Sequence, residues 1–280
     1  NVAFDLMKIH PLECDIGMPW TGGFFKKEGW NSPERIENSI DRFIAATLAY
    51  GHIGWLVEEG HGIRLTCRSY YLIQQVAKRY AMQRPTKIEY ADADGKWLTV
   101  SQALATNAIE NSRLHVVYEN GLELFVNYPT GSTTDDWRIP NKGVTLPPNG
   151  FLARDKDGFI AASMLVNGHR IDQVISPEYV YLDGRGKYAE TEWLATSGAV
   201  AMKFVPTPGP SQEGSYKEPE QLEIIDIEGN NRIGFHCDFS NPVCTAYDPE
   251  GNSLGTAALE VKNGKRWLTC VEGARRYVVC

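Results

Sequence analysis

The sequence lacks any run of apolar residues long enough to cross a membrane. Its longest apolar stretches, residues 45–50 and 53–57, fall far short of the roughly 20 residues that a transmembrane helix needs. An excess of basic residues is also absent, because 28 Lys and Arg stand against 35 Asp and Glu, which gives a net charge of −7. Such a chain offers no positive field to nucleic acid or anionic lipid. We therefore expect no membrane and no nucleic-acid partner.

Motifs for metals and nucleotides are missing as well. The six cysteines form no C-x-x-C pair, and H-E-x-x-H, G-x-S-x-G and the phosphate loop are absent. The Gly-Arg-Gly sequence at 184–186 lacks the third glycine of a dinucleotide fingerprint. Residues 92–95 and 155–158 look like fragments of calcium loops without the remaining ligands, so tight turns explain them better. The sequence predicts no cofactor and no metal site.

The state of the cysteines stays open between two alternatives. Buried thiols are one, because free cysteine is among the most buried residue types. A disulfide in an oxidising compartment is the other, since Cys237 and Cys244 flank a turn that contains proline.

The 280 residues, 42% of them hydrophobic, are enough for about two domains with buried cores. The first 85 residues alternate between strand-like and helix-like patterns. A strand-like run, Val2 to Ile9, precedes a helix that begins with Ser32 as N-cap and Pro33 in the first turn. Apolar residues at the spacing of one helix face are Ile36, Ile40, Phe43, Ile44 and Leu48. A second strand is predicted at His52 to Val57, and a second helix ends before Pro85. This order predicts two adjacent parallel strands joined by a right-handed helical crossover.

From residue 86 onward the apolar period changes to two, as in half-buried strands. The Asn-Gly pair at 120–121 lies between two strand-like runs, which predicts a hairpin with a type I′ turn. Proline and glycine then concentrate in a stretch typical of a linker. The predicted organisation is an α/β region over 1–85, a β-sandwich over 86–205, a linker over 206–221 and a small β domain over 222–280.

Polar and aromatic side chains follow both predicted parallel strands, where α/β proteins bind their ligands. Glu58 and Glu59 follow the second strand and are the candidate catalytic acids, able to protonate a leaving group or bind hydroxyls. The substrate-binding candidates, which carry groups suited to a sugar, are Asp15, Trp20, His52 and Trp55. Each has a structural alternative: core packing for the aromatics and His52, and a solvated turn for the glutamates.

Several segments of the sequence resemble parts of a known family of multidomain enzymes. Residues 4–12 (FDLMKIHPL), 15–18 (DIGM) and 45–55 (AATLAYGHIGW) resemble the last two βα units of a (β/α)8-barrel glycoside hydrolase. Residues 116–127 (VVYENGLELFVN) and 146–151 (LPPNGF) resemble the β-sandwich that often follows such barrels in multidomain enzymes.

The resemblance implies a fold class of α/β followed by all-β: the last βα units of a (β/α)8 barrel, a β-sandwich and a small C-terminal β domain. The acid and nucleophile of such enzymes commonly lie on earlier strands, so some catalytic residues would lie outside this chain. A complementary N-terminal polypeptide would then supply the missing strands, because an exposed barrel edge invites aggregation.

The predicted function is therefore part of a carbohydrate-active glycoside hydrolase, with a carbohydrate ligand and a secreted, periplasmic or cell-surface location. The alternative is a noncatalytic carbohydrate-binding or structural interaction protein whose aromatic residues bind glycan without cleaving it. The chain begins at Asn1 with neither an initiator methionine nor a signal-like segment, so we expect a processed product or part of a longer chain.

Overall fold

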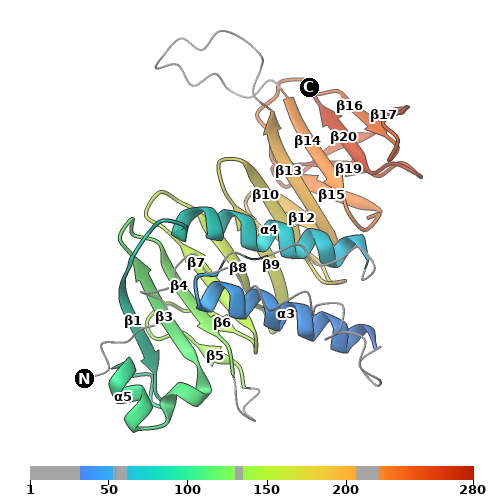
Figure 1. Ribbon diagram of the computed structural model, residues 1–280. Helices are drawn as coiled ribbons and strands as arrows, with labels where there is room; N and C mark the ends of the chain where they lie inside the picture. Colours follow the sequence, from blue (N-terminus) through green and yellow to red (C-terminus); the bar gives the residue numbers. More distant parts are fainter. Residues whose placement is uncertain (1–31, 53, 55–61, 130–134, 206–220) are drawn as a thin grey trace, which may run out of the picture. The chain divides into compact units, whose positions relative to one another are not determined.

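Antiparallel β-sheet dominates the computed structural model (Figure 1), which describes residues 32–52, 54, 62–129, 135–205 and 221–280. Strands make up 42% of the described residues and helices 20%, so β-structure sets the fold class. The chain divides into two compact units, Asn1–Asp172 and Gln173–Cys280. The boundary between them falls within strand β9 (His169–Ile175).

An antiparallel sheet is the framework of the first unit, in which β9 is followed across the sheet by β8, β7, β4, β3, β1 and β2. The strands are β1 (Pro85–Ala91), β2 (Trp97–Thr99), β3 (Arg113–Tyr118), β4 (Glu123–Asn127), β7 (Gly150–Arg154) and β8 (Ile160–Val166). The pairings of β1 with β2 and β3, of β3 with β4, of β4 with β7 and of β7 with β8 are all antiparallel.

Two amphipathic helices, α3 (Pro33–Ala49) and α4 (Ile63–Tyr80), pack on each other and on this sheet (Figure 1). The Ser32 hydroxyl accepts a hydrogen bond from the Arg35 amide at 3.3 Å, which confirms the predicted N-cap. Most of the predicted apolar stripe of α3 is buried, as are Leu72 and Val76 of α4. Helix α5 (Val100–Ala105), capped by Thr99, and the 3-10 helix η2 (Ala108–Asn111) connect β2 to β3.

The helices are fixed to one face of the sheet by a buried network of charges. Arg68 of α4 lies 3.2 Å from Asp172 of β9 (Nε to Oδ2), and both side chains are fully buried. Arg170 of β9 lies 3.0 Å from Asp41 of α3 (Nη1 to Oδ2). The Ser163 hydroxyl of β8 donates to Asp172 Oδ1 at 2.5 Å and accepts from Arg170 Nε at 2.8 Å. Ser163 points to the face that carries the helices. Because side chains alternate along a strand, the preceding residue, Ala162, points to the opposite face.

A short hairpin covers that opposite face. Its strands, β5 (Trp137–Arg138) and β6 (Thr145–Leu146), pair with each other, and β6 also pairs with β8. The buried residues packed under the hairpin are Ala91, Phe125, Trp137, Ile139, Leu146, Leu152 and Ala162. Both faces of the sheet of the first unit are therefore covered, one by helices and the other by a hairpin.

The second unit contains two antiparallel sheets and is β-sandwich-like. One has the order β10, β13, β14, β20, β16, β17, and the other has the order β11, β12, β15, β19, β18. The strands of the first are β10 (Tyr179–Asp183), β13 (Ala199–Val205), β14 (Gln221–Asp226), β16 (Cys244–Tyr247), β17 (Ser253–Ala257) and β20 (Arg276–Val279). Those of the second are β11 (Ala189–Glu190), β12 (Leu194–Thr196), β15 (Arg232–Phe235), β18 (Leu259–Lys262) and β19 (Lys265–Thr269).

The hairpin predicted at Asn120 and Gly121 is confirmed, since these residues connect the antiparallel strands β3 and β4. Its turn type differs from the prediction. Gly121 has a φ of +85°, but Asn120 is not at positive φ, and the Gly121 amide donates to the Tyr118 carbonyl. A type I′ turn needs positive φ at both central residues, so the connection is a wider turn that ends in a left-handed glycine.

The predicted fold class and the resemblance to a (β/α)8 barrel are wrong. The described residues form mostly antiparallel sheet with three α-helices, and the printed pairings between strands of the first unit are antiparallel, which does not fit the parallel βα units of a barrel. An amphipathic helix covers an antiparallel sheet as readily as a parallel one, so the apolar stripes did not distinguish the two arrangements. The predicted strand Val2 to Ile9 and most of His52 to Val57 lie outside the described residues.

The predicted division into 1–85, 86–205, 206–221 and 222–280 stays a prediction, and most of the linker lies outside the described residues.

The described cysteines are all free thiols: Cys67, Cys237, Cys244, Cys270 and Cys280. Cys14 lies outside the described part. No helix within the described ranges is long and apolar enough to cross a membrane.

Replacing Arg68 by methionine should strongly destabilise the first unit. Removing one partner of a buried ion pair leaves Asp172 charged and buried, which costs about 3–5 kcal/mol. The matched control is Arg64→Met, also in α4, whose pair with Glu37 is partly exposed on both sides and should contribute about 1 kcal/mol or less. Urea unfolding of both variants measures the difference. Equal losses of stability would contradict the role given to the buried network.

Candidate functional site

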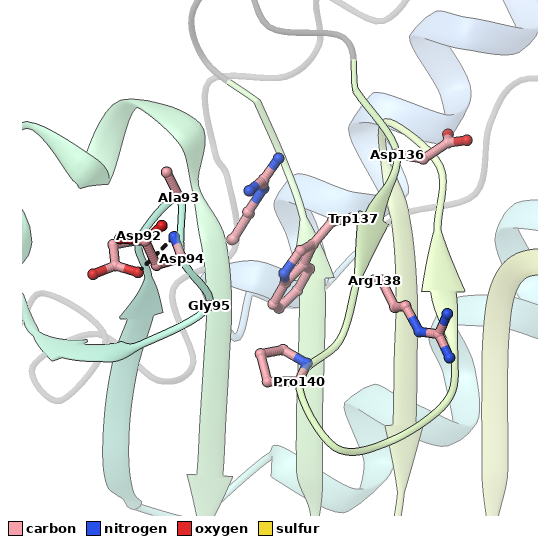
Figure 2. Close-up of a pocket in the computed structure, with 9 residues that line it drawn as sticks. Asp92, Ala93, Asp94, Gly95, Asp136, Trp137, Arg138 and Pro140 are labelled. Atoms are coloured by element: carbon pink, nitrogen blue, oxygen red, sulfur yellow. Dashed lines mark hydrogen bonds between the residues drawn. The ribbon is translucent and has the colours of Figure 1, made fainter.

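A cleft of about 350 Å³ opens on the hairpin-covered face of the first unit. One wall is the turn between β1 and β2, and the other is the hairpin strand β5 with the residues that follow it (Figure 2). The lining residues are Asp92, Ala93, Asp94, Gly95, Arg113, Asp136, Trp137, Arg138 and Pro140. In Figure 2, Trp137 lies in the middle. Asp92 and Asp94 lie on one side of it, and Arg138 lies on the other side.

The first wall is a tight turn held by its own aspartate. Asp92 Oδ1 accepts hydrogen bonds from the amides of Asp94 at 3.0 Å and Lys96 at 2.9 Å. Gly95 has a φ of +80°, and a Cβ there would lie 3.3 Å from Pro140 Cγ of the opposite wall. The turn therefore needs glycine both for its backbone conformation and for its close approach to the hairpin.

The second wall is positioned by Trp137. The indole is 3% exposed and packs against Phe125 of the sheet and edge-on against Trp97, with ring centroids 6.5 and 6.0 Å apart. Because side chains alternate along a strand, burying Trp137 turns the neighbouring Asp136 and Arg138 outward, and both are exposed. Trp137 closes the floor of the cleft and offers little ring face for stacking.

The chemistry of the lining is polar and of mixed sign. Asp92, Asp94 and Asp136 bring carboxylates, which accept hydrogen bonds, and Arg113 and Arg138 bring guanidinium groups, which donate them. The volume is that of a small-ligand site. A ligand that both donates and accepts, and that carries no large net charge, matches this set.

A second polar group lies on the same face of the sheet, next to the cleft. His115 of β3 lies between Glu89 of β1 and Glu123 of β4, with Nδ1 3.2 Å from Glu89 Oε2 and Nε2 3.2 Å from Glu123 Oε1. The imidazole stacks on Phe125 with centroids 4.4 Å apart, and Trp97 lies 5.0 Å away. The cluster thus rests on the same aromatic side chains that hold Trp137.

Burial and neighbouring charges set the ionisation of this cluster. Burial lowers the pKa of His115 and outweighs the two glutamates, which favour the charged ring. Burial opposes ionisation of Glu123, but Arg154 at 2.7 Å and Lys142 at 3.3 Å outweigh it and lower the pKa of that carboxyl. Glu123 is therefore a fixed anion, while His115 takes up a proton only in acid.

Of the predicted site residues, His52 alone lies in the described part of the chain. Asp15, Trp20, Trp55, Glu58 and Glu59 lie outside the described residues, and their roles stay predictions. His52 is half-buried after α3, its carbonyl accepts a hydrogen bond from the Tyr80 hydroxyl, and it does not line the cleft.

Sequence reasoning missed the cleft itself. It explained residues 92–95 and 155–158 as turns, and the structure confirms this, because Asp155 accepts from the amides of Asp157 and Phe159 just as Asp92 does in its own turn. The motif alone did not show that the turn at 92–95 forms one wall of a cleft. The alternation of polar and apolar residues at 136–139 was the available signal for β5.

No group of three or more His, Cys, Asp or Glu side chains in the described part of the chain is placed to hold a metal ion. Comparisons of the chain with protein-family models and with curated proteins gave no match. The cleft and the His115 cluster are therefore interpreted from their own chemistry.

His115 should make stability depend on pH. Its pKa is lowered on folding, so its contribution is fully present above about pH 6.5 and is lost as the pH falls through the lower folded-state value. The His115→Gln variant should lose less stability than the parent between about pH 7.5 and 5, with a slope difference of at most about 1.4 kcal/mol per pH unit. Urea unfolding across this range measures both slopes, and parallel curves would refute the assignment.

Proposed function

We propose that the first unit binds a carbohydrate in the cleft between the β1–β2 turn and strand β5. The proposal rests on the charged side chains of the lining, three aspartates and two arginines, around a floor closed by Trp137. A sugar presents hydroxyl groups that donate to carboxylates and accept from guanidinium groups, so one ring can satisfy both kinds of side chain.

The charge of the lining favours a neutral ligand. Three carboxylates against two guanidinium groups leave no net positive charge for a phosphate or sulfate, and the whole chain carries −7. An apolar ligand matches the lining less well, because five charged side chains surround the cleft and the Trp137 ring is buried. A neutral polyhydroxylated ligand remains as the best match.

Cleavage of a glycosidic bond is not part of this proposal. It was expected from the barrel resemblance, which is wrong, and the candidate acids Glu58 and Glu59 lie outside the described residues. The complementary polypeptide was required only to complete the barrel, so binding at the cleft does not need it. A secreted, periplasmic or cell-surface location suits a glycan-binding protein and stays a prediction.

Asp94→Asn and Arg138→Ala should each weaken glycan binding by about 10- to 100-fold, the range for losing a hydrogen bond to a charged group. Both side chains are exposed, so the fold should tolerate the changes. The full chain is first screened on an array of neutral and acidic glycans. The neutral glycans that bind are then measured by isothermal titration calorimetry, and release of reducing sugar is followed in the same samples.

The matched control is Asp157→Asn, which makes the same change at the same position of the equivalent turn between β7 and β8, away from the cleft. It should bind like the parent. The proposal is overturned if no neutral glycan binds, or if Asp94→Asn and Asp157→Asn reduce affinity equally. Release of reducing sugar would instead revive the hydrolase interpretation.

A further inference from the structure

Both ring nitrogens of His115 face a carboxylate, and the three residues come from adjacent strands. Glu89 of β1 and Glu123 of β4 lie on either side of β3. Glu89 is directly opposite His115 in register, and Glu123 is diagonal to it. The two nitrogen-to-oxygen distances are equal, at 3.2 Å. The side chains thus form a chain of contacts across the sheet, perpendicular to the strands.

The number of protons on the ring decides how many of these contacts are hydrogen bonds. A neutral imidazole carries one N–H and one bare nitrogen, and an ionised carboxylate only accepts. Two hydrogen bonds from His115 to two carboxylates therefore require a proton on each nitrogen. The neutral ring can hold only one of the two glutamates.

Glu123 is the glutamate that the neutral ring keeps. It is fixed from the other side by Arg154, with Nε and Nη2 at 2.9 and 2.7 Å, and by Lys142. Glu89 has a weaker second contact, with the half-exposed Lys87 at 3.7 Å. We assign the single N–H of the neutral ring to Nε2, facing the carboxylate that Arg154 and Lys142 hold in place, so that the bare Nδ1 gives Glu89 no hydrogen bond.

We propose that His115 is an acid-operated clamp: proton uptake at Nδ1 ties Glu89, and with it the end of β1, to β3 and β4. Glu89 stands three residues before Asp92, so the clamp fixes the strand that carries one wall of the cleft. The effect on ligand binding rests on the proposed function, whereas the clamp itself does not. The proton comes from solvent and no other bond is made or broken.

The groups around His115 determine the pH at which the clamp closes. The charged groups that face it or its partners are Lys87 and Glu89 on β1, Arg113 on β3, Glu123 on β4, Arg154 on β7 and Lys142 between β5 and β6. Burial lowers the pKa of His115, so the ring is neutral at pH 7 and the clamp closes as the pH falls below the ordinary pKa of histidine.

Two substitutions of Glu89 separate the clamp from ordinary packing. In Glu89→Gln the side-chain amide can donate to the bare Nδ1, so this variant should stay clamped at every pH. In Glu89→Ala the contact is lost at every pH. Only the parent should change between about pH 7.5 and 5, the range that spans histidine titration.

The first test needs no ligand. In the parent, ¹⁵N NMR of the His115 ring should show a proton on Nε2 alone at pH 7.5 and on both nitrogens in acid, and ¹⁵N relaxation should show residues 92–95 becoming more rigid. In Glu89→Gln these residues should be rigid at both pH values. A neutral ring protonated on Nδ1 would overturn the clamp. So would ¹⁵N relaxation of residues 92–95 that is the same at both pH values and in the Glu89 variants.

The second test measures the affinity of a neutral glycan that binds the parent. Affinity should rise by about three- to tenfold in acid, the fold-change that one hydrogen bond corresponds to, and should be independent of pH in both Glu89 variants. If the affinity of Glu89→Ala for the glycan rises equally in acid, the clamp does not regulate binding at the cleft. If no glycan binds at either pH, the proposed function and its regulation fail together, and the ring and relaxation measurements still decide the clamp.

Discussion

The packing of Trp137 onto the sheet is the interaction on which the candidate site depends. Strands β5 and β6 have only two residues each, too few to hold a hairpin in place by backbone pairing alone. The buried indole supplies the missing anchor by filling the space over Phe125 and beside Trp97. Once Trp137 is fixed, Pro140 meets the β1–β2 turn, and Asp136 and Arg138 are directed to solvent. The cleft is the space left between two short connections that share one apolar floor.

The opposite face of the sheet holds helices α3 and α4 through buried charges. Arg68 of α4 pairs with Asp172, and Asp41 of α3 pairs with Arg170, both partners lying on β9. Buried ion pairs contribute little net stability, but they penalise any shift that separates the partners. Apolar burial supplies most of the folding free energy, and the ion network selects the position of the helices.

Local features of the fold could be predicted from the sequence, and the arrangement in space could not. The Ser32 cap, the apolar stripe of α3 and the hairpin at Asn120 and Gly121 depend on residues close in sequence. The barrel prediction failed because an apolar helix stripe does not reveal whether the sheet beneath is parallel. The cleft was missed because its walls, at 92–95 and 136–140, are about 40 residues apart and meet only through strand order. The His115 cluster was missed for the same reason, since Glu89, His115 and Glu123 become neighbours only through register.

Amide chemical-shift mapping of the full chain during titration with a neutral glycan would locate the binding site. We expect the shifts to concentrate in residues 92–95, Arg113 and 136–140, and the second unit to be unaffected. Shifts that leave these residues unchanged while others move would place the binding site elsewhere and contradict the assignment of the cleft.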